Sequence, residues 1–290
     1  MSDFVHATSS ALGLAPIYIL TATGFVIVYR ATQVFNFAQG ALMMLGAYFT
    51  YQATEKMGLA LVPAIILTVL AMAVVGALIY QLTLRPLTGH GTFGLIIVTM
   101  GVSILLTGIV AAKWGFTALA LSAPEPALGI HSGSFNLGGF DVGSIILTAV
   151  VLGALAAFFQ YAPIGIQMRA TAESPKLASQ RGISVQRIYT ITWMLAGAAA
   201  ALAGAIVSFR TGASPTVAAI GLLAFPAALI GGFDSLRGAI VGGLIVALAQ
   251  AYAAQIWGTE IQEAVVYALM LVVLMIRPYG LFGSPEVLRV

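Results

Sequence analysis

Long runs of apolar residues, separated by short polar stretches, repeat along the whole chain. A helix needs about 20 apolar residues to cross the roughly 30 Å hydrocarbon core of a bilayer. Nine runs approach this length and predict about nine membrane-spanning helices, with a range of eight to ten. The runs cover residues 12–29, 34–53, 59–82, 92–112, 142–161, 188–209, 216–233, 238–257 and 262–276.

Two of these runs are interrupted by polar or helix-breaking residues. Run 34–53 keeps polar side chains up to Gln39, and run 216–233 contains Pro226. Broken helices occur inside membranes where other protein segments bury their exposed backbone groups. Either run is therefore compatible with a re-entrant half-helix that enters and leaves the membrane on one side.

The composition agrees with a membrane protein. Hydrophobic residues make up 60% of the chain, charged residues 7%, and the mean hydropathy is +1.04, whereas soluble domains carry about 25% charged residues. We therefore expect an all-α, polytopic bundle that forms a single transmembrane domain over residues 1–290. The net charge of +3 comes from few residues and does not suggest a nucleic-acid partner. With no cysteine and only three scattered histidines, we expect no metal site and no cofactor.

One long stretch, residues 162–187, is polar without being a mere turn. It holds a third of the twelve basic residues but a single acid. These residues are Arg169, Lys176, Arg181, Arg187 and Glu173. We interpret the stretch as a surface loop between two spans.

The positions of Lys and Arg predict the orientation of the chain. If 162–187 faces the cytoplasm, nine spans place nine basic residues inside and three outside, as the positive-inside rule requires. The N-terminus is then outside and the C-terminus is cytoplasmic. The inside set is Arg30, Arg85, Arg169, Lys176, Arg181, Arg187, Arg237, Arg277 and Arg289, and the outside set is Lys56, Lys113 and Arg210.

A short helix is predicted within the polar loop. Ser174 can cap it, Pro175 suits its first position, and Gly182 can supply a left-handed stop. The expected helix comprises Ser174, Pro175, Lys176, Leu177, Ala178, Ser179, Gln180, Arg181 and Gly182. Two turns are not stable alone in water, so the helix must pack against something. It either lies on lipid headgroups or docks on a soluble cytoplasmic partner.

Four segments of the chain resemble the permeases of branched-chain amino acid type ABC transporters. The segments occur in the same order as in that family and span nearly the whole chain. They are VFNFAQGALMMLGAYFTY at 34–51, MRATAESPKLASQRGISVQRIYTITWMLAGAAAALAGAI at 168–206, GLLAFPAALIGGFDSLRGAIVGGL at 221–244 and RPYGLFG at 277–283.

The resemblance implies a pump component without chemistry of its own. The chain has no G-x-x-x-x-G-K-[ST] phosphate loop, so ATP would be bound by other subunits. In the family, two cytoplasmic ATP-binding cassette subunits drive the permease, and the helix at 174–182 would sit in a cleft of one of them. Arg169, Glu173 and Arg187 would make rim contacts. The resemblance also implies a second, homologous permease and an extracytoplasmic solute-binding protein.

The translocation path is predicted from polar residues within the spans. Asn36 and Gln39 lie one turn apart, and an unpaired amide in lipid costs several kcal/mol. Thr99 and Ser103 form an i,i+4 pair in the fourth run and are weaker candidates for the opposite wall. For each of these, a hydrogen bond that only fixes helix packing is the alternative interpretation.

Small residues predict close helix approaches. Ala200-x-x-x-Gly204 and Gly238-x-x-x-Gly242 are small-xxx-small faces, which pack either within this chain or against a second permease. The long loop at 113–141 is expected to face outside, where it could meet the solute-binding protein.

Three function classes compete at this point. The first is the permease subunit of an ABC importer for branched-chain or related amino acids in a bacterial inner membrane. The second is a stand-alone channel or secondary transporter for small polar solutes, which the absence of a central Asp, Glu or Lys in the spans disfavours for proton or sodium coupling. The third, a membrane enzyme, would need paired ionisable residues at helical spacing within the spans, and the runs contain none.

Overall fold

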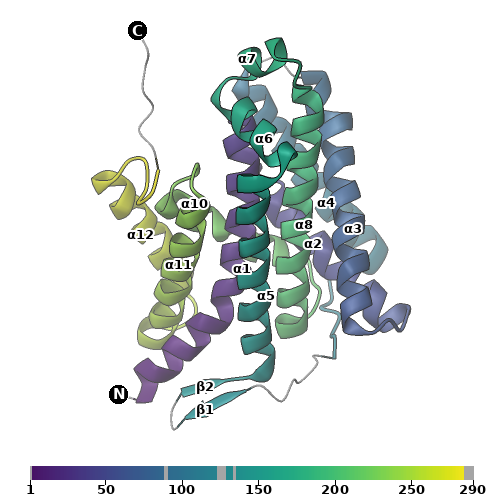
Figure 1. Cartoon of the computed structure of the whole chain (residues 1–290). Helices are drawn as coiled ribbons and strands as arrows, with labels where there is room; N and C mark the ends of the chain where they lie inside the picture. The colour runs from purple at the N-terminus through teal and green to yellow at the C-terminus, as the bar shows by residue number, and fades with distance from the viewer. Residues whose placement is uncertain (1, 88–90, 123–128, 133–134, 284–290) are drawn as a thin grey trace.

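The protein is described by a computed structural model that covers residues 2–87, 91–122, 129–132 and 135–283 (Figure 1). Helices dominate it. They are α1 (Ser2–Thr32), α2 (Gln39–Tyr51), α3 (Leu61–Ile79), α4 (Thr92–Trp114), α5 (Gly139–Tyr161), α6 (Pro163–Glu173), α7 (Pro175–Gln180), α8 (Val185–Thr211), α9 (Val217–Leu222), α10 (Ala224–Gly231), α11 (Leu236–Trp257) and α12 (Gln262–Ile276). Residues 52–56 and 80–84 continue α2 and α3 as π-helical turns.

The all-α polytopic bundle is confirmed, with one small exception. Two antiparallel strands, β1 (Ile130–Ser132) and β2 (Phe135–Leu137), form a hairpin in the loop at 113–141, where no strand was predicted. They are only 3 residues each, too short for a periodic pattern to reveal. Pro124, Glu125 and Pro126 of this loop lie outside the described residues.

Among the described residues, six helices are long and apolar enough to cross a membrane: α1, α3 with its continuation, α4, α5, α8 and α11. The other three predicted runs are shorter helices. Run 34–53 yields the 13-residue α2, run 216–233 is divided into α9 and α10, and run 262–276 is the 15-residue α12. Run 262–276 has the same bounds as α12, whereas runs 34–53 and 216–233 are longer than the helices within them because most of the irregular residues in those runs are apolar as well.

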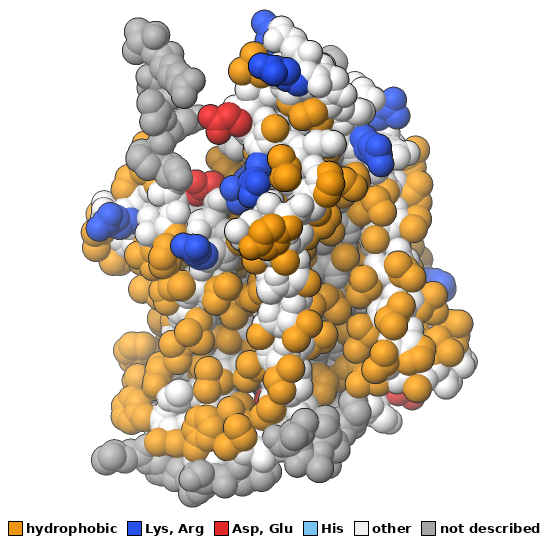
Figure 2. All heavy atoms as spheres, in the orientation of Figure 1, with side chains coloured by type: hydrophobic (Ala, Val, Ile, Leu, Met, Phe, Trp, Pro, Cys, Tyr) orange, Lys and Arg blue, Asp and Glu red, His pale blue; other side chains and the backbone are white. Residues whose placement is uncertain are grey.

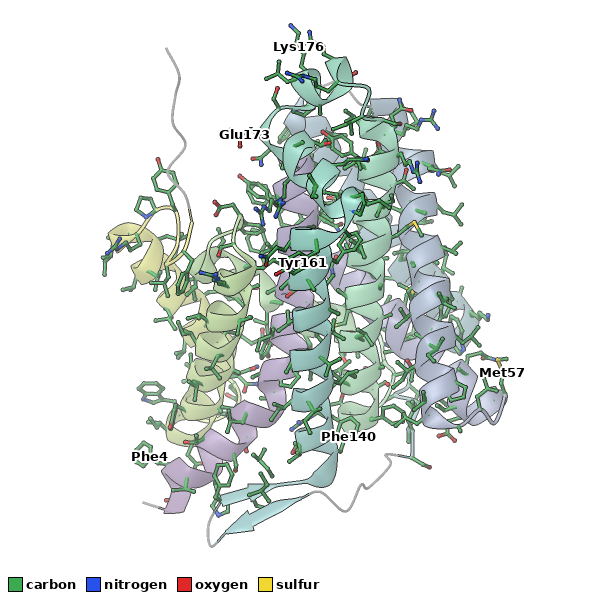
Figure 3. All side chains as sticks on the ribbon, in the orientation of Figure 1. Phe4, Met57, Phe140, Tyr161, Glu173 and Lys176 are labelled. Atoms are coloured by element: carbon green, nitrogen blue, oxygen red, sulfur yellow. The ribbon has the colours of Figure 1, made fainter. Side chains whose placement is uncertain are left out.

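The elements alternate in direction between two ends of the bundle (Figure 1). We call these the α7 end, where α6 and α7 protrude, and the hairpin end, where β1 and β2 lie. α1 begins at the hairpin end, and α12 ends towards the α7 end. Figure 3 shows Phe4, Met57 and Phe140 at the hairpin end, and Glu173 and Lys176 at the tip of the α7 end.

Helix α1 forms the centre of the bundle. In the most apolar 18-residue window of α1, 89% is buried, whereas the corresponding windows of α4 and of α5 are each 17% buried. It packs against α8 and α11, and a Cβ at Gly243 of α11 would lie 2.9 Å from the backbone nitrogen of Ile19 in α1. Figure 2 shows a broad hydrophobic belt around the middle of the face in view, with Lys and Arg side chains gathered towards the α7 end.

The predicted small-residue faces pack within the chain. A Cβ at Gly204 of α8 would lie 2.7 Å from the backbone nitrogen of Ala47 in α2. Gly238 and Gly242 of α11 pack against α10, where a Cβ at Gly242 would lie 2.9 Å from the nitrogen of Gly231. Both distances are too short for a real side chain, so these glycines set how closely the helices approach.

Replacing Gly204 with valine should destabilise the bundle. The added side chain must separate α8 from α2, and overpacking of this kind costs about 1–3 kcal/mol. We expect a lower melting temperature for the purified chain in detergent. The matched control is Gly153→Val in α5, where a Cβ meets nothing within 4 Å; equal melting temperatures for the two variants would contradict the assignment.

Candidate functional site

The polar stretch at 162–187 folds as two helices rather than one. α6 starts at Pro163, whose fixed φ and missing N–H suit the first helical position, and was not predicted. It packs against α5 and against the first half of α8 through buried residues that include Gly165, Met168 and Thr171. α6 thus supports α7 from beneath.

The predicted short helix α7 is present with the expected start and stop. The Ser174 side chain accepts a hydrogen bond from the backbone N–H of Leu177 at 3.3 Å, and Pro175 occupies the first helical position. Gly182 has a φ of +80°. Its N–H bonds the carbonyl of Ser179 at 3.0 Å, and the N–H of Ile183 bonds the carbonyl of Ala178 at 3.0 Å. These two bonds form a Schellman motif.

Helix α7 turns one small residue inwards and the rest outwards. Ala178 is buried, whereas Leu177 is 61% exposed at the outermost part of the chain. The exposed set around Leu177 is Arg169, Glu173, Pro175, Lys176, Ser179, Gln180, Arg181, Gly182 and Arg187. The surface therefore offers an apolar contact within a rim of mostly positive charge, which is an arrangement typical of a protein interface.

Three of the four predicted path residues meet in one hydrogen-bonded network at the start of α2. The amide of Asn36 donates to the Gln39 Oε1 at 3.0 Å, and its oxygen accepts from the Ala38 N–H at 3.1 Å. The Gln39 amide donates to the carbonyl of Ala196 in α8 at 3.3 Å. The hydroxyl of Thr99 in α4 accepts from the Phe37 N–H at 3.2 Å.

This network holds a break between α1 and α2. Gln33 follows α1 with a φ of +54°, and residues 34–38 then return into the bundle, where the carbonyl of Ala38 accepts from the Leu42 N–H of α2. Thr99 and Asn36 are partners for backbone groups of this segment, and Gln39 fixes the Asn36 side chain; all three are at most 1% exposed. Ser103, one turn further along α4, is half-buried, and its carbonyl accepts from Thr107 at 2.9 Å.

Aromatic rings pack around the same break. Tyr29 and Phe35 stack with ring centroids 4.8 Å apart, and Phe35 contacts Phe233 edge-on at 5.0 Å. Phe225 of α10 lies 5.4 Å from Phe37 and also 5.4 Å from Phe233. α1, the break and α10 are thus joined by one aromatic cluster. The sequence shows these phenylalanines as ordinary apolar residues, so only the structure reveals their grouping.

A partly buried ion pair between two helices is a further feature that the sequence did not predict. Arg210 at the end of α8 donates to Asp141 in the first turn of α5. The two side chains are 24% and 22% exposed. In the sequence Arg210 is only one of three positive charges on the outer side, although an arginine at the end of an apolar run is itself a signal worth testing.

Comparison with known proteins agrees with this architecture. Residues 7–274 match the family described as branched-chain amino acid transport system / permease component. The chain is 30% identical over 301 residues to the high-affinity branched-chain amino acid transport system permease protein LivH of Escherichia coli K12, covering 99% of this chain and 98% of that protein. It is 29% identical over 307 residues to the permease protein BraD of the same type of system in Pseudomonas aeruginosa, again with 99% and 98% coverage.

A more distant relative is the probable branched-chain amino acid transport permease protein LivH of Methanocaldococcus jannaschii, 28% identical over 281 residues that cover 91% of this chain and 88% of that protein. No solved structure gives a significant match.

The bundle is therefore that of a multi-pass membrane permease, a transport component that carries no catalytic chemistry of its own. The chain belongs to the branched-chain amino acid ABC transport permease family, which confirms the resemblance drawn from its four motifs.

The network at the break predicts a large effect of Asn36→Leu. Leucine would leave the Ala38 N–H and the Gln39 Oε1 buried without these partners, and each unsatisfied group costs about 1–3 kcal/mol. We expect a clear fall in melting temperature and in the yield of folded protein. Gln160→Leu, at an exposed position of α5, is the control. An Asn36→Leu protein that melts with the control would show that the network does not hold the break.

Proposed function

We propose that this chain forms the substrate path of a binding-protein-dependent ABC importer for branched-chain or related amino acids. Path opening alternates between the two membrane faces and is driven by partner ATPases. The observation that carries the proposal is the capped helix α7, which projects Leu177 from one end of a permease bundle. A two-turn helix with both ends fixed by local hydrogen bonds is a rigid lever suited to transmit motion from a docked partner.

The proposed partners are three kinds of protein subunit, together with the lipid bilayer. Two cytoplasmic ATP-binding cassette subunits bind α7 and its rim, and the sequence lacks a phosphate loop with which the chain could bind ATP itself. A second, homologous permease pairs with this one in the bilayer, where the 17% burial of α4 and of α5 leaves long apolar faces uncovered. A solute-binding protein meets the hairpin end.

The proposed location is the bacterial inner membrane, with the N-terminus outside and the C-terminus in the cytoplasm. Opposite positions of the two termini fit an odd number of crossings, and nine result if 33–56 and 217–231 each count as one. The basic residues support this orientation, although Arg289 lies outside the described residues. Those at the α7 end are Arg30, Arg85, Arg169, Lys176, Arg181, Arg187, Arg237 and Arg277.

Asn36, Gln39 and Thr99 then form a closed barrier in the path rather than an open wall. Their polar atoms are engaged with one another and with backbone groups, and the aromatic cluster packs beside them. Transport requires the break to open, so α2 and α10 are the elements that we expect to move. Such discontinuous elements are the moving parts in other transporters that work by alternating access.

The docking role of α7 predicts a specific crosslink. Because the chain has no cysteine, Ser179→Cys places one thiol on the exposed side of α7, whereas Ala178 faces the bundle. With a co-expressed ATPase that carries cysteines in its docking cleft, we expect crosslinking at position 179. Thr216→Cys, in the loop at the hairpin end, is the control and should not crosslink. Transport that persists without any crosslink at position 179 would count against docking.

Charge at the apolar contact should uncouple the complex. Leu177→Glu buries a carboxylate wherever Leu177 docks, and an unpaired charge in an interface costs several kcal/mol. We expect ATP-driven uptake to fall at least about tenfold, while Leu177→Met retains most of it. Chain levels in the membrane, read by immunoblot, should be equal. Normal uptake by Leu177→Glu would exclude α7 as the coupling element, as would uptake by the chain alone in liposomes.

Orientation can be measured with the same cysteine-free background. An impermeant maleimide added to intact spheroplasts should label Glu260→Cys at the hairpin end and leave Ser179→Cys unlabelled. After permeabilisation, both should react, because both positions are exposed. The opposite pattern would place the N-terminus in the cytoplasm.

A further inference from the structure

A cavity of about 240 Å³ lies within the hairpin-end half of the bundle. Its walls come from α1, the end of α8, α9, α11 and the start of α12. One wall is apolar and includes Ile17, Ile220 and Leu223. The cavity is slightly smaller than the roughly 300–1,000 Å³ typical of pockets for drug-sized ligands. It therefore suits a small solute.

The opposite wall carries a guanidinium in a fixed position. Arg210 lines the cavity, and Asp141 accepts a hydrogen bond from its Nη1 atom. Gly13 of α1 gives the group room, since a Cβ there would lie 2.6 Å from Nη1. A guanidinium has five N–H donors, and its planar fork matches a carboxylate. Arg210 can therefore receive a second carboxylate, either beside Asp141 or in its place.

An acidic side chain lines the same cavity from another element. Glu263 lies in the first turn of α12 and is exposed, and no ion pair to it is present among the described residues. Two further lining residues are bonded to each other, since the Tyr18 hydroxyl donates to the side-chain oxygen of Gln250. Both residues are buried, at 1% and 8% exposed, so the floor of the cavity is polar.

We infer that this cavity is an entry subsite for a zwitterionic amino acid with a small apolar side chain. The carboxylate binds Arg210, the ammonium binds Glu263, and the side chain lies against Ile17, Ile220 and Leu223. A zwitterion brings no net charge, so the cavity need not enclose an uncompensated ion. The inference deepens the proposed function and rests on it for the direction in which the solute moves.

The location of the cavity fits a step before the closed barrier. Tyr18 of the cavity and Gly24, which packs under the Gln39 amide, are six residues apart in α1. At about 1.5 Å per residue, the separation is about 9 Å along the helix. A solute bound beside Tyr18 is thus next to the network of Asn36, Gln39 and Thr99, on its hairpin side.

Protection of a single cysteine tests the site. In the complete transporter without nucleotide, Thr211→Cys places a thiol on the cavity wall, and Thr216→Cys places one outside it. We expect excess L-leucine to slow labelling of position 211 several-fold and to leave position 216 unchanged. Two probes that each lack one charge, 4-methylpentanoate and isopentylamine, should not protect. Phosphoethanolamine, which carries both charges without the branched chain, should not protect either.

A second test removes the negative charge of Glu263. Glu263→Gln in the Thr211→Cys background should raise the half-protecting concentration of leucine about tenfold or more, because the ammonium loses its carboxylate partner and keeps only a hydrogen bond to an uncharged amide. Glu260→Gln, an exposed neighbour outside the cavity, should leave it unchanged. Equal protection by leucine and by the singly charged probes would overturn the inference. So would no protection by leucine, protection by phosphoethanolamine, or protection that is insensitive to Glu263→Gln.

Measuring uptake in the same preparation tests the subsite and the proposed importer function separately. ATP-driven leucine uptake without protection of position 211 by leucine would reject the subsite but remain consistent with the importer. Leucine protection without any ATP-driven uptake of an amino acid would keep the subsite and reject the importer.

Discussion

Every buried backbone N–H and C=O needs a partner, and the break between α1 and α2 is where this requirement shapes the molecule most strongly. A continuous helix would satisfy the groups of residues 34–38 internally. Here Thr99 of α4 accepts from the Phe37 N–H and Asn36 accepts from the Ala38 N–H, while the Gln39 side chain donates to the carbonyl of Ala196 and so joins α2 to α8. Four elements are thereby tied to one point. Their relative positions follow from a few side-chain hydrogen bonds in the middle of an apolar bundle.

Close packing of small residues makes this arrangement possible. α11 approaches the central α1 closely at Gly243, and α8 approaches α2 and α3 closely at Gly204 and Gly197. In a bilayer, contact between helices brings no hydrophobic gain over contact with lipid, so tight packing and hydrogen bonds must supply the stability. The same principle explains why the outer helices expose apolar side chains. α4 and α5 keep large apolar side chains on faces that the chain itself does not cover.

The two ends of the bundle carry different kinds of chemistry. At the α7 end, positive charge and the exposed Leu177 surround a locally fixed helix. At the hairpin end, Arg210, Asp141 and Glu263 bring both signs of charge to a cavity with an apolar wall. Between them lies the sealed network with its aromatic neighbours. In the proposed importer the two ends have separate roles: the ATPases dock at the α7 end, the solute enters at the hairpin end, and the network is the barrier between them.

The sequence by itself determined whatever depends on local chemistry. Apolar run length predicts the membrane class, and the Ser174, Pro175 and Gly182 positions predict α7, because caps and stops act within a few residues. The motifs at 34–51 and 221–244 indicate the permease class because each is a continuous run of residues that can be recognised without the fold. Only the tertiary structure decided that Asn36, Gln39 and Thr99 meet, that Gly204 and Gly242 pack inside the chain, and that Arg210 shares a cavity with Glu263. Thr99 lies 60 residues after Gln39 (99 − 39), and Glu263 lies 53 residues after Arg210 (263 − 210). No local pattern records which helix faces which over such separations.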